Sequence, residues 1–377
     1  MTKGARSRLG KRAARLPLLA LGMVALVTAL WGALVRVGWK APLPSYNWLS
    51  WHGPLMVCGF LGTVIGLERA VGLARPWAYA APLGTGVGAL LLVAGDLSRR
   101  GPALVTLGSA VFLAILLVVV KIQPQRQNVV MALGAVAWIA GNVRWLLGAP
   151  FNASALFWGA FVVLTIAGER LQLTRFLPPR RGSRGAFTAA SAVLFAGIVL
   201  SLRWPAAGSR LAGCGFLALG VWLLLFDIAR VNARREGLTR FVALALLPGY
   251  VWLSVSGLLL ALRALPEHGM LYDAILHTLF VGFVFSMIFG HAPIIFPAVL
   301  AVTMAFRPLV SYAPLVLLHL SLALRIAGDL TERSPLRMWG GLLNVAAVLL
   351  FVIGTVTSIR RAEDYGSSAT PSSPASA

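Results

Sequence analysis

The sequence predicts an all-α, polytopic transmembrane bundle of about twelve helices, and three observations lead to this fold class. Hydrophobic residues make up 59% of the 377 residues, while charged residues make up only 12%. Twelve segments are long and apolar enough to cross a bilayer, since a spanning helix needs about 20 such residues. Basic residues are unevenly divided between alternate connections. Because no connection is long enough for a soluble domain, a single membrane bundle is expected.

The twelve segments define one membrane domain over residues 17–361. A basic segment, residues 1–16, precedes it, and a Ser-, Pro- and Ala-rich segment, residues 362–377, follows it and is expected to be disordered. In chain order the expected spans are 17–37, 49–70, 77–97, 102–121, 128–148, 153–174, 186–204, 208–230, 241–264, 270–300, 309–326 and 336–359.

The charge distribution predicts the orientation of the bundle. The segments on the side of the N-terminus hold 22 of the 33 Lys and Arg residues, and those on the opposite side hold 11. This bias is typical of the positive-inside pattern, so both termini are expected in the cytoplasm. The net charge of +22 then faces anionic lipid of the bilayer, and no nucleic-acid partner is expected.

Glycines recur four residues apart within two of the expected spans. Gly62 and Gly66 form one such pair, and Gly84 and Gly88 form another. Small residues at this spacing let helix backbones approach closely, so tight helix packing is expected at both pairs.

Two histidines at the beginning of apolar segments are the leading candidates for a functional site. His52 opens the second span, and His277 lies seven residues after Met270, about 10 Å into the tenth. Both spans enter from the side opposite the N-terminus, which places the two residues at similar depth. Because ionisable side chains inside a bilayer are costly, a functional role is the default interpretation. Two neutral imidazoles at one depth predict axial ligation of a haem, against the plainer alternative of interfacial histidines that bond to neighbours.

Three further residues have more than one interpretation each. Asp273 shares a helix face with His277 and either orients the imidazole or is a helix-start acid. His291 lies about 21 Å deeper on that helix, where it serves a second metal, a proton path or the inner interface. His319, in the middle of the eleventh span, is either a buried structural residue or a ligand. His268 is expected in a loop.

A haem in this position needs cations for its propionates. Arginine suits carboxylates, and Arg325 and Arg144 are the preferred candidates because both lie within apolar segments. They belong to a larger set of arginines at the outer ends of the spans, namely Arg36, Arg144, Arg203, Arg263, Arg325, Arg333 and Arg337.

A short acid–base pattern closes three helices at the cytoplasmic end. Glu68-Arg69 ends the second span and Glu169-Arg170 the sixth, while Asp227 and Arg230 stand in a related position on the eighth. Local pairing at the interface explains the pattern, and a proton path through Glu68 and Glu169 is the alternative.

Trp51-His52 with Met56, the run Gly249-Tyr250-Val251-Trp252, and His277 with Gly282 form a pattern that resembles the NnrS family of integral membrane haem proteins. The resemblance implies a bacterial inner-membrane protein, haem b held by His52 and His277, and a part in nitric oxide tolerance or membrane electron transfer, with a quinol or small redox donor as partner. The matching residues are Trp51, His52, Met56, Gly59 and Phe60, then Gly249-Tyr250-Val251-Trp252, then His277, Leu279, Val281, Gly282 and Met287, and finally Leu324-Arg325.

The same spans are distantly similar to subunit I of the haem–copper oxidases. His52-Gly53 with Met56, and His277 with Gly282 and Phe296-Pro297, resemble that subunit's second and tenth helices. The sixth and seventh spans contain no histidine, Ile275 stands at the position of the high-spin haem ligand, and Pro54 replaces a second histidine of the NnrS pattern. Copper and oxidase-type oxygen reduction are therefore not expected, and whether the protein is an enzyme stays open. The rival hypothesis is a proton-coupled transporter without haem.

Overall fold

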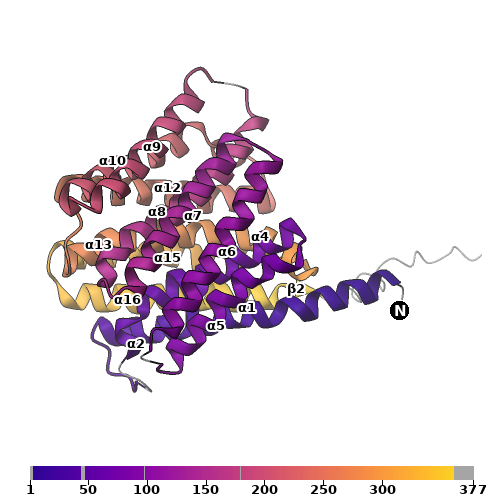
Figure 1. Ribbon diagram of the computed structural model, residues 1–377, viewed down its shortest axis with the longest axis horizontal. Coiled ribbons are helices and arrows are strands. Elements are labelled where there is room, and N and C mark those ends of the chain that lie inside the picture. Colours follow the sequence, from indigo (N-terminus) through magenta and orange to yellow (C-terminus); the bar gives the residue numbers. More distant parts are fainter. Residues whose placement is uncertain (1–2, 44–46, 97, 179, 361–377) are drawn as a thin grey trace, which may run out of the picture.

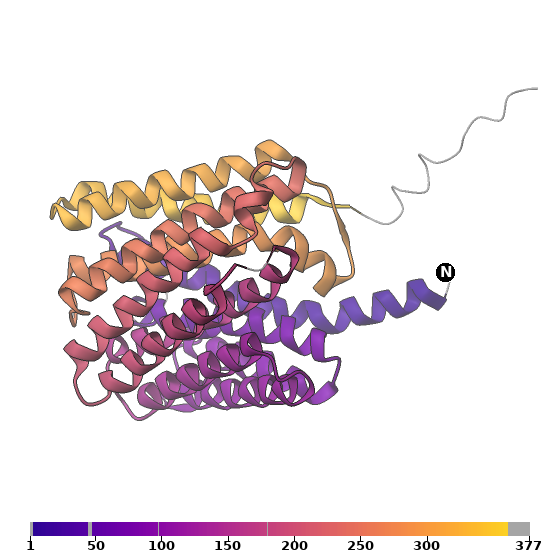
Figure 2. The same ribbon diagram turned by 90° about the horizontal axis from the view of Figure 1, so that it is seen from above.

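The computed structural model describes residues 3–43, 47–96, 98–178 and 180–360, and within them the fold is all-α, as predicted. Twelve of the described helical segments are long and apolar enough to cross a membrane. They lie side by side with alternating direction, so that every connection falls at one of the two ends of a bundle (Figures 1 and 2). The chain is thus built as a multi-pass membrane bundle.

Several spans are assembled from more than one helical element. The second joins α3, η1 and α4, the third joins η2 and α5, the sixth joins α8 and η3, and the tenth joins α13, η4 and α14. In chain order the helical elements are α1 (Lys3–Arg36), α2 (Asn47–Ser50), α3 (His52–Pro54), η1 (Leu55–Leu61), α4 (Gly62–Leu73), η2 (Pro76–Tyr79), α5 (Ala80–Val93), α6 (Arg100–Ile122), α7 (Arg126–Leu146), α8 (Phe151–Leu173), η3 (Thr174–Phe176), α9 (Ser183–Ser201), α10 (Pro205–Phe226), α11 (Ala229–Asn232), α12 (Gly237–Arg263), α13 (Met270–His277), η4 (Thr278–Phe285), α14 (Ser286–Leu300), α15 (Pro308–Leu330) and α16 (Ser334–Thr357).

Both chain ends extend beyond the spans. Helix α1 begins at Lys3, so most of the basic segment predicted over residues 1–16 continues the first span as helix (Figure 1). The tail predicted over 362–377 lies outside the described residues. Just before it, β2 (Ile359–Arg360) pairs antiparallel with β1 (Thr303–Met304), which ties the end of α16 to the connection between α14 and α15.

The predicted close packing is confirmed at Gly62, Gly84 and Gly88, whereas Gly66 has ordinary contact with Pro82 at 3.4 Å. A Cβ on Gly62 would stand 2.5 Å from the Trp138 ring, and one on Gly88 would stand 2.8 Å from the carbonyl oxygen of Gly101. The tightest approach joins α9 to α10, where a Cβ on Gly208 would meet the backbone nitrogen of Ser201 at 2.2 Å. Here two helix backbones touch because Gly208 on α10 faces Gly197 on α9, and neither glycine carries a side chain.

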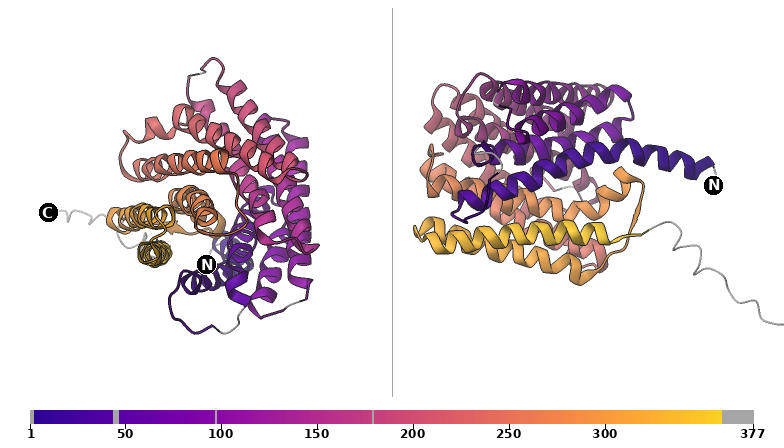
Figure 3. Two further views of the ribbon diagram at one scale, coloured as in Figure 1. Left: turned by 90° about the vertical axis from the view of Figure 1, so that its left-hand side faces the viewer. Right: turned by 90° about the horizontal axis from the view of Figure 1, so that it is seen from below.

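The helices are arranged around a core of aromatic and aliphatic side chains. Viewed nearly along the helix axes, α9, α10 and α12 gather on one side, and α15 and α16 lie with the tenth span on another (Figure 3). Trp138, Phe161 and Phe112 pack between α6, α7 and α8, with the first two rings parallel at 4.3 Å. This core packs against the second span where Trp138 faces Gly62, and α8 packs against the tenth span where Gly159 faces Leu279.

Candidate functional site

The structure brings His52 and His277 together, although they lie on spans far apart in the sequence. Their imidazole rings are parallel within 6°, and the ring centres are 6.4 Å apart. His52 is the first residue of α3 and His277 the last of α13. The ring centres are farther apart than the roughly 3.5–4.0 Å between carbon atoms in contact, so the two rings are not stacked directly face to face.

Hydrogen bonds to the backbone fix which nitrogen of each ring is free. The Nδ1 of His52 donates to the carbonyl oxygen of Ala29 on α1 at 2.9 Å, and the Nδ1 of His277 donates to that of Asp273 at 2.8 Å. A carbonyl oxygen only accepts, so each Nδ1 carries the proton of the neutral ring and each Nε2 keeps its lone pair. Neither Nε2 bonds to another residue of the described chain. Both rings therefore present an unused ligand atom.

A π-helical segment directly follows each histidine-bearing α-helix. Segment η1 begins three residues after His52, and η4 begins at Thr278. In the tenth span the cause is visible, because the carbonyl of Ile275 accepts bonds from the hydroxyls of Thr278 and Ser256. These donors satisfy the carbonyl, so the helix leaves its regular register at little cost. Such widened turns occur frequently at functional sites.

The two histidines line a cavity of about 730 Å³ at the end of the bundle opposite the N-terminus. Its volume falls within the range of pockets for small molecules and cofactors, about 300–1,000 Å³. Apolar side chains form most of the wall, among them Met56, Leu61, Phe280, Phe285 and Val348. Polar side chains are the minority of the lining, which is the composition expected of a binding site.

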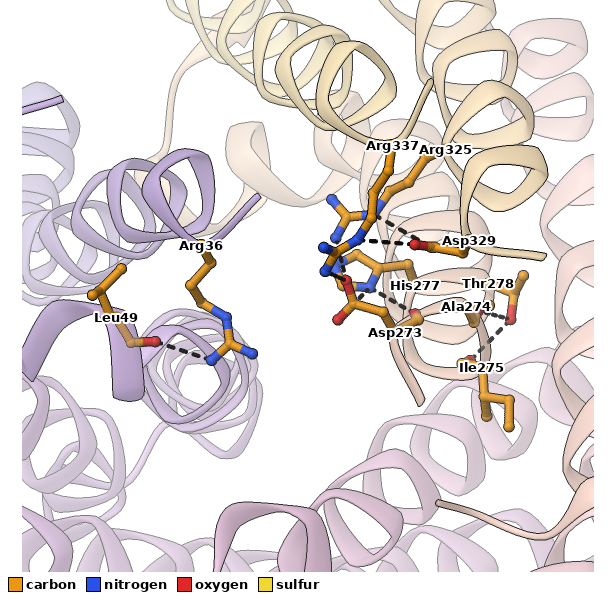
Figure 4. Close-up of polar contacts among 10 residues, drawn as sticks. All are labelled: Arg36, Leu49, Asp273, Ala274, Ile275, His277, Thr278, Arg325, Asp329 and Arg337. Atoms are coloured by element: carbon orange, nitrogen blue, oxygen red, sulfur yellow. Dashed lines mark hydrogen bonds and ion pairs between the residues drawn. The ribbon is translucent and has the colours of Figure 1, made fainter. Parts of the chain in front are cut away.

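The main polar group at the wall is a cluster of two aspartates and two arginines, of which Asp273, Arg325 and Arg337 line the cavity and Asp329 does not (Figure 4). The Oδ2 of Asp273 accepts from Arg325 Nη2 at 2.8 Å and from Arg337 Nη2 at 2.5 Å. Asp329 Oδ1 lies 3.0 Å from Arg337 Nε, and its Oδ2 lies 3.9 Å from Arg325 Nε. All but Arg337 are almost completely buried. The four charges balance, as buried charges require.

A third arginine faces this cluster from another helix. Arg36, at the end of α1, also lines the cavity and donates to the carbonyl oxygen of Leu49 at 3.0 Å (Figure 4). Its guanidinium has no carboxylate partner among the described residues. In the cluster, the Nη1 atoms of Arg325 and Arg337 likewise bond to no other described residue. The cavity thus has cationic donors available on two sides.

Comparison with known proteins places the chain in a family without an assigned role. Residues 15–360 match a family described as a domain of unknown function, DUF8744. The chain belongs to this family. No curated protein matches the sequence. Within the described residues, no group of three or more His, Cys, Asp or Glu side chains is arranged to hold a metal ion.

Asp273 contacts His277 in a different way from the one predicted. Its carboxylate Oδ1 lies 3.8 Å from the imidazole Nδ1, beyond hydrogen-bond distance, and the backbone carbonyl of the same residue accepts the bond instead. The carboxylate is committed to Arg325 and Arg337. Asp273 therefore contacts His277 through its backbone carbonyl and the two arginines through its carboxylate.

The structure separates the two arginines that the sequence favoured. Arg325 lines the cavity, whereas Arg144 lies over the ring of Phe157 at 5.3 Å and is not in the wall. Sequence reasoning preferred Arg144 to Arg337 because it stands deeper in an apolar segment. Arg337 lies one turn into α16, and the acids that hold it belong to other helices. The sequence signal for this cluster is the spacing of Arg325 and Asp329, which stand four residues apart and therefore share a helix face.

His319 and His268 differ in their relation to the cavity. His319 Nδ1 accepts from Trp252 Nε1 at 3.1 Å, and its Nε2 lies 3.5 Å from Ser286 Oγ, whose own hydroxyl donates to Gly282. This chain of bonds occupies both nitrogens outside the cavity wall. His268 is in a loop, as expected, and it lines the cavity mouth.

The acid–base pairs at the other end of the bundle connect helices to one another. Arg69 on α4 pairs with Glu169 on α8, and Arg170 pairs with Asp227 through two bonds of 2.8 and 2.9 Å. The Nη1 of Arg170 also lies 3.4 Å from the Nε2 of His291. The expected local pairing is thus replaced by pairing between spans. Glu68 forms no hydrogen bond or ion pair with another described residue.

Proposed function

We propose that this protein is an integral membrane haem-binding protein that holds haem b between His52 and His277 and transfers electrons within the membrane. The observation that carries the proposal is the pair of parallel imidazoles, 6.4 Å apart, each with its Nδ1 bonded to a backbone carbonyl. The apolar cavity that both rings line supports it. Two histidines are the axial ligands of many low-spin haems.

The spacing of the rings agrees with one shared metal ion. A metal–imidazole bond is about 2.0–2.1 Å long and a ring nitrogen lies about 1.1 Å from the ring centre, so imidazoles on opposite sides of one ion have centres roughly 6.3 Å apart. The observed separation is 6.4 Å. The bonds from Nδ1 to Ala29 and Asp273 are the outer partners that usually orient a ligating histidine. The donor atoms therefore fit the group.

The cationic wall fits the two propionates of a haem. Arg36 and the free Nη1 atoms of Arg325 and Arg337 supply donors on two sides of the cavity. Asp273 and Asp329 hold the latter two arginines in position. A planar guanidinium recognises a carboxylate through paired hydrogen bonds, so these residues would fix the orientation of the group.

Haem b supplies one-electron chemistry when it is bound. The protein would position it, exclude water with the apolar wall and leave its edge near the mouth at His268, where a quinol or a small redox donor could approach. By its resemblance to the NnrS family and to the haem–copper oxidases, we place the protein in a bacterial inner membrane, give it an oxidase-like core, and extend its role to nitric oxide tolerance. From the distribution of Lys and Arg we place both termini in the cytoplasm. A role in nitric oxide tolerance requires that one imidazole leaves the iron, since two histidines close it.

Haem content of the purified full-length protein tests the proposal. We expect about one haem b per chain. The absorption spectrum of the reduced protein and the low-spin electron paramagnetic resonance signal of the oxidised protein should both be typical of two imidazole ligands. His52→Gly and His277→Gly should each abolish this signal, and added imidazole should restore it by filling the vacated position.

A matched control separates ligation from general damage to the cavity. His268→Ala changes an exposed histidine at the mouth of the same cavity and should leave the spectrum unchanged. Colourless protein from haem-replete cells that also fails to take up haemin would refute the proposal. In that case proton-coupled transport through the cavity becomes the stronger hypothesis, and Arg69–Glu169 and Arg170–Asp227 would be the first pairs to test.

A further inference from the structure

A second cavity, of about 870 Å³, lies at the N-terminal end of the bundle, on the opposite side of the membrane from the histidines. It is formed where the connection from α8 to α9 approaches the end of α10 and the short helix α11. Its lining is far more polar than that of the first cavity. Five arginines contribute to it, namely Arg175, Arg180, Arg184, Arg230 and Arg234.

These five positive charges are not neutralised by the protein. Asp227 is the one carboxylate in the lining, and its two oxygens already accept bonds from Arg170. None of the five lining arginines forms an ion pair with a described residue. All five are exposed. A concentration of unpaired guanidinium groups in a concave site is a site for an anion.

The backbone adds to the positive potential. Helix α9 begins at Ser183, which is part of the lining, so the positive end of a 19-residue helix faces the cavity. The free amide groups of a first helical turn bind phosphate oxygens readily. The helix end and the arginines thus favour the same kind of ligand, one that carries a phosphate.

Exposed apolar side chains surround the arginines. Leu225 and Val231 belong to the lining and are 48% and 45% exposed, and Phe176, next to Arg175, is 63% exposed. All three lie at the end of a membrane-spanning segment or just beyond it. A soluble phosphate compound would leave these apolar side chains uncovered, whereas the acyl chains of a lipid would cover them.

We propose that this cavity binds the headgroup phosphate of an anionic phospholipid from the leaflet at the N-terminal end of the bundle. The arginines and the start of α9 hold the phosphate, and the acyl chains lie along Phe176, Leu225 and Val231 on the outside of the bundle. Basic pockets between spans on the cytoplasmic side are suited to such headgroups. The site is independent of the histidine cavity and of haem.

The test measures lipid binding by the full-length protein in detergent, by native mass spectrometry and by titration with a fluorescent phosphatidylglycerol. We expect dioleoylphosphatidylglycerol to bind in preference to dioleoylphosphatidylcholine. The triple substitution Arg180→Gln, Arg184→Gln, Arg234→Gln should raise the Kd at least tenfold, since one basic residue near a membrane surface changes binding by about fivefold.

A second triple variant loses the same charge at the same end of the bundle. Arg75→Gln, Arg126→Gln, Arg240→Gln removes three exposed arginines that do not line the cavity, and it should bind the lipid as the unmodified protein does. An equal loss in both variants would show general attraction and overturn the proposal.

Competition with inorganic phosphate distinguishes a lipid headgroup from a free phosphate compound as the ligand. If inorganic phosphate displaces the lipid at a similar concentration, the site is one for free phosphate compounds and the lipid assignment is wrong. Absence of binding by either also overturns it.

Discussion

Replacing Asp273 with asparagine tests the charge balance of the cavity wall. The substitution preserves the shape of the side chain and removes one of the two negative charges that face Arg325 and Arg337. Asparagine has a neutral carbonyl in place of the carboxylate, so the four-residue cluster changes from neutral to a net charge of +1. Arg325 is only 5% exposed and would keep Asp329, at 3.9 Å, as its remaining counter-ion.

The magnitude follows from the two bonds that are weakened. Removing one partner of a buried ion pair costs about 3–5 kcal/mol. The lower end applies here, because the Arg337 side chain is 22% exposed and regains some hydration. We therefore expect Asp273→Asn to reduce the free energy of unfolding by about 3 kcal/mol. Since each 1 kcal/mol shifts the Tm of a large domain by about 2 °C, the apparent Tm should fall by about 6 °C.

Thermal unfolding of the purified protein in detergent, followed by tryptophan fluorescence, measures this loss. Asp96→Asn is the control, because that aspartate is partly exposed at the end of a turn and, among the described residues, its carboxylate accepts hydrogen bonds from Ser98 alone. In the double variant, Arg337→Gln should restore part of the stability that Asp273→Asn removes, since the cluster becomes neutral again. The reasoning is refuted if Asp273→Asn behaves like Asp96→Asn, or if the two cluster substitutions are additive.

Three further predictions concern the site, the packing and the orientation. If both histidines ligate the haem iron, carbon monoxide should change the reduced spectrum little, and rapid binding with a large shift would show an open iron and revive direct nitric oxide binding. Gly197→Ala should lower the apparent Tm by several degrees, because its Cβ would meet the backbone of α10 at 2.3 Å, whereas Gly185→Ala on the same helix has open space and should be neutral. A periplasm-active reporter fused after Glu363 should be silent while a cytoplasm-active one works, and the reverse pattern would place the histidine cavity on the cytoplasmic side.

The histidine site could be located from sequence because of the cost of burial. An imidazole within an apolar span needs a reason, and the depth of each followed from counting residues along a helix. Counting residues does not give the rotation of each helix about its axis, which decides which side chains line the cavity. Arg144 and Arg337 both stand near the end of the bundle opposite the N-terminus, yet of the two Arg337 alone lines the cavity. The π-helical segments η1 and η4 were equally invisible, since hydroxyl donors such as Ser256 come from a neighbouring span.

The acid–base pairs show the same limit at the other end. Sequence placed Glu169 beside Arg170 and predicted local pairing, whereas the structure joins Glu169 to Arg69 and Arg170 to Asp227. Adjacent residues on a helix point in different directions, so each side chain meets a different neighbouring span. Which spans are neighbours depends on packing of the whole bundle. That information is not contained in any single segment.

Asp273 connects the parts of the site in a way that separates their roles. Its backbone carbonyl orients His277, while its carboxylate holds Arg325 and Arg337. Asparagine keeps the carbonyl and loses the charge, so the imidazole should stay in place while the arginines loosen. In a haem-loaded protein, Asp273→Asn should therefore retain the low-spin signal of two imidazoles and yet release haem more readily, because the propionates lose firmly held partners. Loss of the low-spin signal itself would mean that the carboxylate orients His277 after all, despite the 3.8 Å between them.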